Sequence, residues 1–264
     1  MIKLIAVDLD GTLLDDNKNI HPSFWEVHKT LTERGVIFIA ASGRQYYNLL
    51  EQFDRIRDEI IFLAENGTFV VYKGHELFVN DLSFDDARYF IRKGRNIKGA
   101  DLILCGKQSA WVENNFEPFI EDASRYYRRL KLVDDLTTVD DKVLKVTLWD
   151  HENAEFNSYP HFKEYEKDFK IAVAGDVWLD ITHNNASKGN AIKRIQQLFG
   201  ITPEETLIFG DYLNDLDMMQ VGYHSYAMKN AHPKIIEASR FVTRYDNNNN
   251  GVVETIKELF NLNS

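Results

Sequence analysis

The sequence contains a single cysteine, Cys105, so the chain has no partner for an internal disulfide. This is typical of proteins that work in a reducing compartment. Apolar runs are short, and none approaches the roughly 20 residues that a membrane helix needs. Asp8 interrupts the apolar run at the N-terminus, where a secretory signal would be longer. We therefore expect a cytoplasmic protein that does not bind membranes.

Basic residues are fewer than acidic ones, with 31 Lys and Arg against 41 Asp and Glu, and the formal net charge is -10. Because nucleic-acid binding depends on concentrated positive charge, we expect no nucleic-acid partner. The eight histidines include no H-x-x-x-H pair, which disfavours a zinc site. The phosphate-binding patterns G-x-G-x-x-G and G-x-x-x-x-G-K-[ST] do not occur, which disfavours a dinucleotide-binding protein and a P-loop ATPase.

Short apolar strands alternate with helices at both ends of the chain, and 44% hydrophobic residues are ample for a core. In the first 80 residues we expect strands at 2–7, 36–42 and 60–67, helices at 22–34 and 45–53, and a hairpin at 68–79. From residue 187 we expect helices at 188–199, 214–220, 233–238 and 251–260 and strands at 206–210, 224–228 and 241–243. This alternation predicts an α/β fold with a doubly wound, mostly parallel, Rossmann-like sheet.

The middle of the chain has a different pattern, in which strands come in adjacent pairs and apolar residues alternate with polar ones. We expect hairpins at 102–112 and 170–181, a strand at 143–149, and helices at 84–98, 116–130 and 155–168. This predicts an antiparallel sheet covered by helices on one face. The domain boundaries that follow are a core of 1–82 and 185–264, with an inserted α+β domain of 83–184.

The stretch "DLDGT" ends the first strand in two carboxylates, Asp8 and Asp10. Their spacing lets both side chains emerge on the same side of the strand. Two such charges repel one another unless a cation lies between them, and Mg²⁺ prefers oxygen ligands of this kind. Gly11 permits a tight turn, and we expect the Thr12 hydroxyl to cap the backbone there. For an isolated D-x-D, a solvated acidic turn is the ordinary alternative.

A second strand ends in the same way, in "IFGDYLNDLD" at 208–217. Because the carboxyl ends of parallel strands meet at one edge of a sheet, Asp211 is expected to share a metal with Asp8. Asn214 and Asp215 begin the next predicted helix, where helix capping is the simpler explanation for either residue alone. Two acidic strand ends together favour a metal site.

Two further segments are candidates for binding an anion. Ser42 and Gly43 follow a strand and place a hydroxyl and backbone N–H groups at a turn into a helix, although such a pair also serves as a plain helix cap. Lys188 opens the helix of 188–199, where a positive charge opposes the helix dipole. A bound anion would explain its position, and a solvated surface lysine is the alternative.

These four segments, "DLDGTLL", "SGR", the lysine of "SKGNA" and "GDYLND", closely resemble the four motifs of the haloacid dehalogenase-like hydrolases. The inserted domain resembles the C2B-type cap of the Cof-type, class IIB sugar-phosphatase branch. "ENG" at 65–67 and "AMKNA" at 227–231 are also similar to that branch. Lys229 departs from it, because glycine is common there.

The resemblance implies a Mg²⁺-dependent phosphatase acting on small phosphorylated metabolites, with sugar phosphates favoured. Asp8 would be the nucleophile, and Asp10 would be the general acid and then the general base. The implied metal ligands are Asp8, Asp211 and the backbone carbonyl of Asp10, with Asp215 supporting them. The implied phosphate-binding groups are the Leu9 amide, Ser42, Gly43, Lys188 and Asn214.

Two residues are candidates for contact with the rest of the substrate. Arg44 follows Ser42-Gly43, and His183 lies at the predicted hinge between the domains; a surface role is the alternative for each. For Trp111, Trp149 and Trp178, on predicted strands of the inserted domain, core packing is the main interpretation and stacking on a substrate sugar the other. A phosphomutase of the same architecture, or a protein that only binds phosphometabolites, would carry the same motifs. The sequence does not indicate an oligomeric state.

Overall fold

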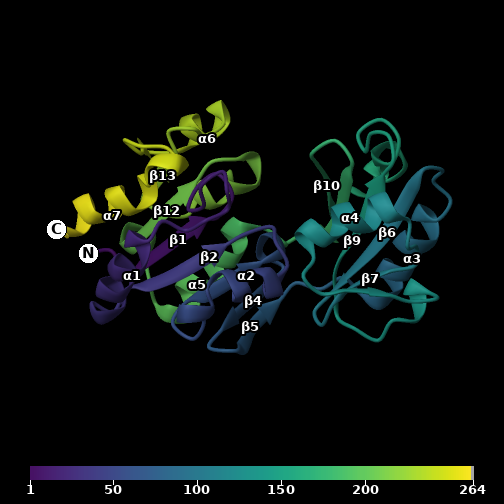
Figure 1. Ribbon diagram of the computed structural model, residues 1–264, viewed down its shortest axis with the longest axis horizontal. Helices are drawn as coiled ribbons and strands as arrows, with labels where there is room; N and C mark the ends of the chain where they lie inside the picture. Colours follow the sequence, from purple (N-terminus) through teal and green to yellow (C-terminus); the bar gives the residue numbers. More distant parts are fainter. Residues whose placement is uncertain (263–264) are drawn as a thin grey trace. The chain divides into compact units, whose positions relative to one another are not determined.

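The computed structural model describes residues 1–262, which form two compact units along the chain (Figure 1). Unit 1 comprises Met1–Gly43, Phe53–Leu77 and the chain from Ser187 onward. Unit 2 comprises Arg44–Gln52 and Phe78–Ala186. The boundaries predicted from the sequence, at 82/83 and 184/185, remain a prediction.

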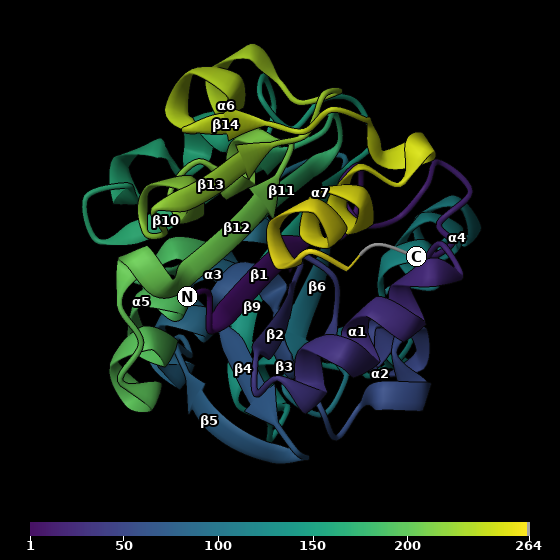
Figure 2. The same ribbon diagram turned by 90° about the vertical axis from the view of Figure 1, so that its left-hand side faces the viewer.

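The sheet of unit 1 has eight strands in the order β14-β13-β12-β1-β2-β3-β4-β5. They are β1 (Leu4–Asp8), β2 (Ile37–Ala41), β3 (Ile61–Ala64), β4 (Phe69–Tyr72), β5 (His75–Val79), β12 (Thr206–Gly210), β13 (His224–Ala227) and β14 (Phe241–Val242). Pairing is parallel from β14 through β3, and β3 and β4 pair antiparallel. The prediction of a mostly parallel sheet is confirmed. Figure 2 shows β12, β1 and β2 side by side at its centre.

Helices cover both faces of this sheet, since every residue of β1 is buried. They are α1 (Ser23–Glu33), α5 (Lys188–Phe199), α6 (Pro233–Ala238) and α7 (Gly251–Phe260). The buried residues of α1 are Phe24, Val27, His28 and Leu31, which recur at helical spacing, and the helix packs against α7 and β2. α5 begins after Ser187, whose side chain accepts a hydrogen bond from the Asn190 N–H.

Two helices predicted from the sequence are wrong. In place of a helix at 214–220, two 3₁₀ turns span Leu213–Asp215 and Met218–Gln220, because the Asp215 carboxylate accepts hydrogen bonds from the backbone N–H groups of Asp211 and Tyr212. A helix at 155–168 is likewise replaced by 3₁₀ turns.

In that second segment the turns span Tyr159–His161 and Lys163–Tyr165. Pro160 has no N–H to donate, and the side chains of Asn157 and Ser158 bind the Asp150 carboxylate. These local bonds hold the backbone away from helical geometry.

The sheet of unit 2 has six strands in the order β10-β11-β9-β6-β7-β8. They are β6 (Ala100–Gly106), β7 (Ala110–Val112), β8 (Leu130–Leu132), β9 (Val143–Asp150), β10 (Phe169–Ala174) and β11 (Trp178–His183). The pairs are antiparallel except for β7 with β8. The helices of this unit are α2 (Tyr46–Gln52), α3 (Phe84–Gly94) and α4 (Glu117–Tyr126).

Helices lie on both faces of this second sheet, so the prediction of a single covered face is wrong. Leu102 and Leu104 of β6 pack in one apolar cluster with Phe90 of α3. The alternate residue Ile103 packs in another cluster, with Phe119 of α4. Because successive side chains of a strand point to opposite faces, the two helices must cover opposite faces.

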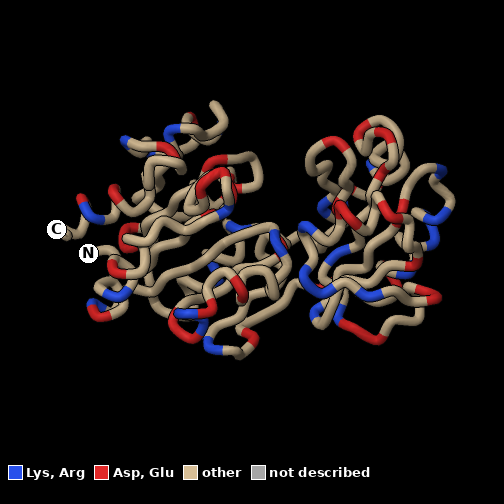
Figure 3. The backbone as a smooth tube through the Cα atoms, viewed as in Figure 1, with Lys and Arg blue, Asp and Glu red and all other residues tan. Residues whose placement is uncertain are grey.

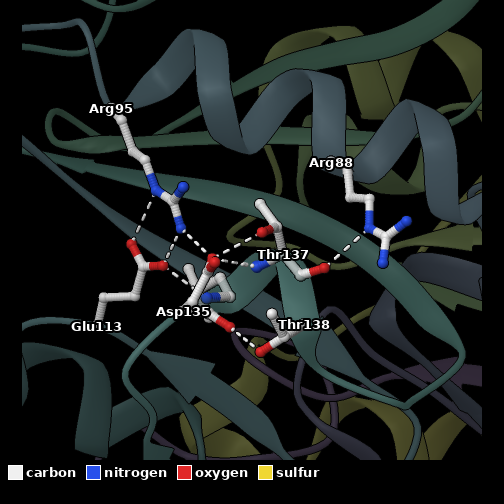
Figure 4. A network of polar contacts seen from close by, with 7 residues as sticks. Arg88, Arg95, Glu113, Asp135, Thr137 and Thr138 are labelled. Carbon is white, nitrogen blue, oxygen red and sulfur yellow. Dashed lines mark hydrogen bonds and ion pairs between the residues drawn. The ribbon is translucent and has the colours of Figure 1, made fainter.

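A network of ionic and polar contacts joins α3 to the loop before β9 (Figure 4). Arg95 forms ion pairs with Glu113 and, at 2.6 Å, with Asp135. Asp135 in turn accepts a hydrogen bond from the Thr137 N–H at 2.8 Å, and Arg88 donates to the Thr137 carbonyl oxygen. The Arg95 guanidinium holds the pKa of Asp135 well below its usual range. The network adds polar contacts to a loop whose Leu136 and Val139 are already buried in the apolar cluster of this unit.

Acidic and basic residues are interspersed along both units (Figure 3). Within residues 1–262, every helix is too short or too polar to cross a bilayer.

Candidate active site

The two acidic strand ends lie next to one another in the sheet of unit 1. β1 and β12 pair in parallel, with Val7 opposite Phe209, so Asp8 at the end of β1 and Asp211 just beyond β12 come to the same edge. Sites in open α/β sheets form at this carboxyl edge.

Three carboxylates form a compact cluster there. Asp8, Asp211 and Asp215 each place an oxygen within 4.8 Å of the others, and Asp8 and Asp215 are buried. Burial, reinforced by repulsion from Asp215, raises the pKa of Asp8 well above its ordinary value. The same two causes raise the pKa of Asp211 to about 6. A buried, mutually repelling set of oxygen ligands fits a hard divalent cation such as Mg²⁺.

Lys188 lies in the middle of this cluster. Its Nζ is 2.5 Å from Asp8 Oδ1 and 2.6 Å from Asp215 Oδ1, and the side chain is fully buried. Burial by itself would lower the pKa of Lys188, but the two carboxylates outweigh burial and raise the pKa above its ordinary value. The first residue of α5 is therefore a protonated lysine. Its charge is unfavourable at the positive end of the helix dipole, and the ion pairs with Asp8 and Asp215 offset this cost.

The "DGT" turn fits around Asp211. Gly11 has a φ of +81°, and a side chain at this position would overlap the Asp211 carboxylate. The Thr12 hydroxyl donates a hydrogen bond to Asp211 Oδ1 at 3.0 Å and so orients this carboxylate. The prediction that this hydroxyl caps the backbone of the turn is wrong. The sequence gives no local signal for this contact, because the two residues lie 199 positions apart.

Asp10 has a different environment from Asp8. Its carboxylate lies outside the cluster of three, is 40% exposed, and accepts a hydrogen bond from Lys18 Nζ at 2.8 Å. An accessible carboxylate is suited to exchanging a proton with a substrate or with water.

The predicted phosphate-binding residues share a neighbour, Asn66, which lies in the "ENG" segment noted in the sequence but was not predicted as a site residue. The Asn66 N–H donates to the Ser42 carbonyl oxygen at 2.9 Å, and Asn66 Oδ1 accepts a hydrogen bond from Asn214 Nδ2 at 3.1 Å. A Cβ at Gly43 would lie 3.1 Å from Asn66 Nδ2. Asn66 therefore links Ser42, Gly43 and Asn214. Leu9, the remaining predicted residue, is fully buried beside Asp8 in the chain.

Arg44 and His183 belong to unit 2. Arg44 lines a groove of about 350 Å³ with Asn48, Glu51 and Gln52. The ring Nδ1 of His183 accepts a hydrogen bond from the Asn185 N–H at 3.1 Å. Their predicted contact with substrate remains a prediction.

Each of the three tryptophans packs against an apolar cluster of unit 2, which agrees with the predicted role in core packing. Trp111 and Trp149 also donate hydrogen bonds to Asp141 and Asp122.

Residues 5–256 match the family model of the haloacid dehalogenase-like hydrolases. The chain belongs to this family. The match covers both units and all the residues of the cluster, so the family predicted from the motifs is confirmed. The chain is an enzyme, a phosphatase of the haloacid dehalogenase type.

Known proteins resemble the chain over nearly its whole length. The 5-amino-6-(5-phospho-D-ribitylamino)uracil phosphatase YbjI of Escherichia coli is 33% identical over 263 residues, covering 98% of this chain and 96% of the relative. A crystal structure from Eubacterium rectale is 28% identical, with a TM-score of 0.90, and 98% of this chain and 99% of that one are covered.

The class IIB sugar phosphatase BT4131 has a TM-score of 0.81 at 21% identity, with 98% of this chain and 99% of that one covered. At this level of identity, the similarity shows a shared fold. Together with the two sheets described above, the comparisons confirm the predicted fold class, a Rossmann-like core with an inserted α+β cap.

Proposed function

We propose that this phosphatase is Mg²⁺-dependent and hydrolyses small phosphorylated metabolites, sugar phosphates foremost, through an aspartyl-phosphate on Asp8. The observation that carries the proposal is the buried cluster in which Asp8 shares the Lys188 ammonium with Asp215 and lies against Asp211. An oxygen nucleophile held beside a fixed positive charge is what phosphoryl transfer requires.

The metal would be held by Asp8, Asp211 and the Asp10 backbone carbonyl, with Asp215 supporting the shell. When bound, Mg²⁺ supplies positive charge that draws a phosphoryl group toward the cluster and offsets charge in the transition state. The raised pKa values of Asp8 and Asp211 and the closeness of the three carboxylates support this assignment, because a cation relieves their repulsion.

The chemical steps fall to two aspartates. Asp8 attacks phosphorus as the bond to the leaving oxygen breaks, and Asp10 gives its proton to that oxygen. A water molecule then attacks phosphorus, Asp10 takes the proton from it, and the bond to Asp8 breaks to release inorganic phosphate. The 40% exposure of Asp10 supports this role, since both proton transfers need access to the substrate side.

Positioning of the phosphoryl group falls to the remaining predicted residues. Lys188 is buried and held between Asp8 and Asp215, and its positive charge would balance the charge on the oxygens of the transferring group. The Leu9 amide, Ser42, Gly43 and Asn214 would donate hydrogen bonds to the same oxygens.

The relative at 33% identity suggests the first substrate to test, the ribityl phosphate 5-amino-6-(5-phospho-D-ribitylamino)uracil. It carries its phosphate on a sugar-alcohol chain, in keeping with the sugar-phosphate class. In this proposal the cap, 83–184, selects the substrate, Arg44 and His183 contact it, and the enzyme works in the cytoplasm.

The test is release of inorganic phosphate with Mg²⁺ from this compound, a panel of sugar phosphates and p-nitrophenyl phosphate. We expect wild-type turnover on at least one, no turnover by Asp8→Asn or Asp10→Asn, and a raised Mg²⁺ requirement for Asp211→Asn. Wild-type rates equal to those of Asp8→Asn on every compound would favour a protein that only binds phosphometabolites. Activation by an added bisphosphate, with isomerised product in place of free phosphate, would favour a phosphomutase.

A further inference from the structure

The turn between β3 and β4 has an unusual backbone. Glu65, Asn66 and Gly67 have φ angles of 50°, 55° and 91°, so three consecutive residues are left-handed and two of them are not glycine. Left-handed backbone is unfavourable for residues with a side chain and persists where surrounding contacts hold it. The contacts around the turn are therefore the place to find its role.

Those contacts reach three separate segments of the active site. As described above, Asn66 binds the Ser42 carbonyl through its backbone and Asn214 through its side chain. Gly67 lies against the carbonyl of Ser187, the residue that caps α5 immediately before Lys188, and a Cβ at Gly67 would overlap that oxygen.

The Asn66 side chain gives the most specific of these contacts. Its Oδ1 accepts a hydrogen bond from Asn214 Nδ2 at 3.1 Å across 148 positions of sequence. Its amide group also lies close to Gly43, since a Cβ at Gly43 would be 3.1 Å from Asn66 Nδ2 and 3.2 Å from Oδ1. A turn that only joined two strands would need no such partner, because its side chain would be free in solvent.

We propose that Asn66 is a positioning residue of the phosphate site, setting the side chain of Asn214 against the Ser42-Gly43 loop. Gly67 serves the same purpose for α5, since only a residue without a side chain lets the start of that helix come so close. The inference rests on the proposed function, in which Ser42, Gly43, Lys188 and Asn214 hold the phosphoryl group. It adds a residue that does not itself touch the reacting atoms.

The informative variant is Asn66→Gly, which removes the amide but tolerates a positive φ and keeps the backbone N–H. We expect its affinity for inorganic phosphate with Mg²⁺, measured by titration calorimetry, to fall about 10-fold, as the loss of one positioning hydrogen bond implies. kcat/KM should fall by a similar factor. The melting temperature should stay within a few degrees of wild type, since glycine relieves strain at this position.

A matched control is Lys73→Gly. Lys73 also has a positive φ, 51°, in an exposed turn of unit 1, and this substitution should leave phosphate affinity unchanged. A double-mutant cycle separates positioning from general loosening. If Asn66 acts through Asn214, Asn66→Gly should lower phosphate affinity by less than about twofold when Asn214 is already alanine.

Two results would overturn the inference while leaving the function intact. One is an Asn66→Gly enzyme with wild-type phosphate affinity and kcat/KM. The other is a double variant whose loss of phosphate binding free energy equals the sum of the losses in Asn66→Gly and Asn214→Ala. A wild-type protein that neither binds phosphate nor exceeds Asp8→Asn in turnover would instead reject the proposed function, and this inference with it.

Discussion

The hydroxyl of Thr12 donates a hydrogen bond to Oδ1 of Asp211 at 3.0 Å, which ties the turn after β1 to the loop after β12. Asp211 also places a carboxylate oxygen within 4.8 Å of Asp8 and Asp215, so the bond holds a member of the acidic cluster. Side chains that orient a metal ligand in this way typically change metal affinity about 10- to 100-fold when they are removed.

Thr12→Val keeps the shape of the side chain but cannot donate a hydrogen bond. We expect the Mg²⁺ concentration for half-maximal phosphatase activity to rise by about 10-fold or more, with little change in activity at saturating Mg²⁺. Thr12→Ser retains the hydroxyl and should behave as wild type. Equal Mg²⁺ requirements for the valine and serine variants would contradict the role given to this bond.

Gly11→Ala tests how closely the turn fits around Asp211. The added methyl group would overlap the Asp211 carboxylate, and the φ of +81° adds backbone strain. We expect loss of Mg²⁺-dependent turnover. Gly35→Ala is the matched control, because Gly35 has a similar φ of +74° but nothing within 4 Å of the added atom. Both variants should lose about 1–2 kcal/mol of stability from strain, and only Gly11→Ala should lose metal activation.

Lys188→Met removes the buried cation between Asp8 and Asp215. Since two buried carboxylates would lose their partner, we expect the free energy of unfolding at pH 7 to fall by about 3–5 kcal/mol in urea titrations with chelator present. Added Mg²⁺ should recover part of this loss, because it supplies the missing positive charge. Lys193→Met, at an exposed position of the same helix, should change stability by less than about 0.5 kcal/mol. A loss below about 1 kcal/mol for Lys188→Met would show that the ion pairs are not needed for stability.

His28 should make stability depend on pH. It lies on the buried face of α1, where its side chain is 1% exposed and its ring contacts Phe38 edge-on. Burial lowers the pKa of its ring from 6.5 to about 4. Glu59 lies 3.8 Å away, but it is half exposed and its attraction for the proton is weakened by solvent. The unfolded chain therefore binds more protons than the folded one between these two values.

The stability that the neutral ring contributes is complete above about pH 6.5 and is lost as pH falls toward 4. Between pH 7 and pH 5 this amounts to about 2 kcal/mol. We expect His28→Leu to reduce the pH dependence of the unfolding free energy by this amount, and His75→Leu, at an exposed histidine, to leave it as in wild type. An unfolding free energy that depends on pH equally in wild type and in His28→Leu would contradict the prediction.

The predictions that rest on local pattern agree best with the structure. Alternation of buried strands with amphipathic segments such as 22–34 is enough to predict a parallel sheet, since a strand apolar on both faces must be covered on both. Parallel strands end at one edge of a sheet, so the sequence is enough to predict that Asp8 and Asp211 lie close together. The helices predicted at 155–168 and 214–220 fail because polar side chains, Asp215 among them, bind nearby backbone or one another in ways that periodicity does not reveal.

The sequence by itself determined which residues are candidates for the chemistry and at which strand ends they lie, because these follow from periodicity and motif along the chain. Only the tertiary structure decided which partners those residues have. Lys188 binds Asp8 and Asp215, Thr12 binds Asp211, and Asn66 binds Asn214. Each of these bonds joins distinct segments of the folded chain, and hydrogen bonds depend on distances that folding sets rather than on spacing in the sequence.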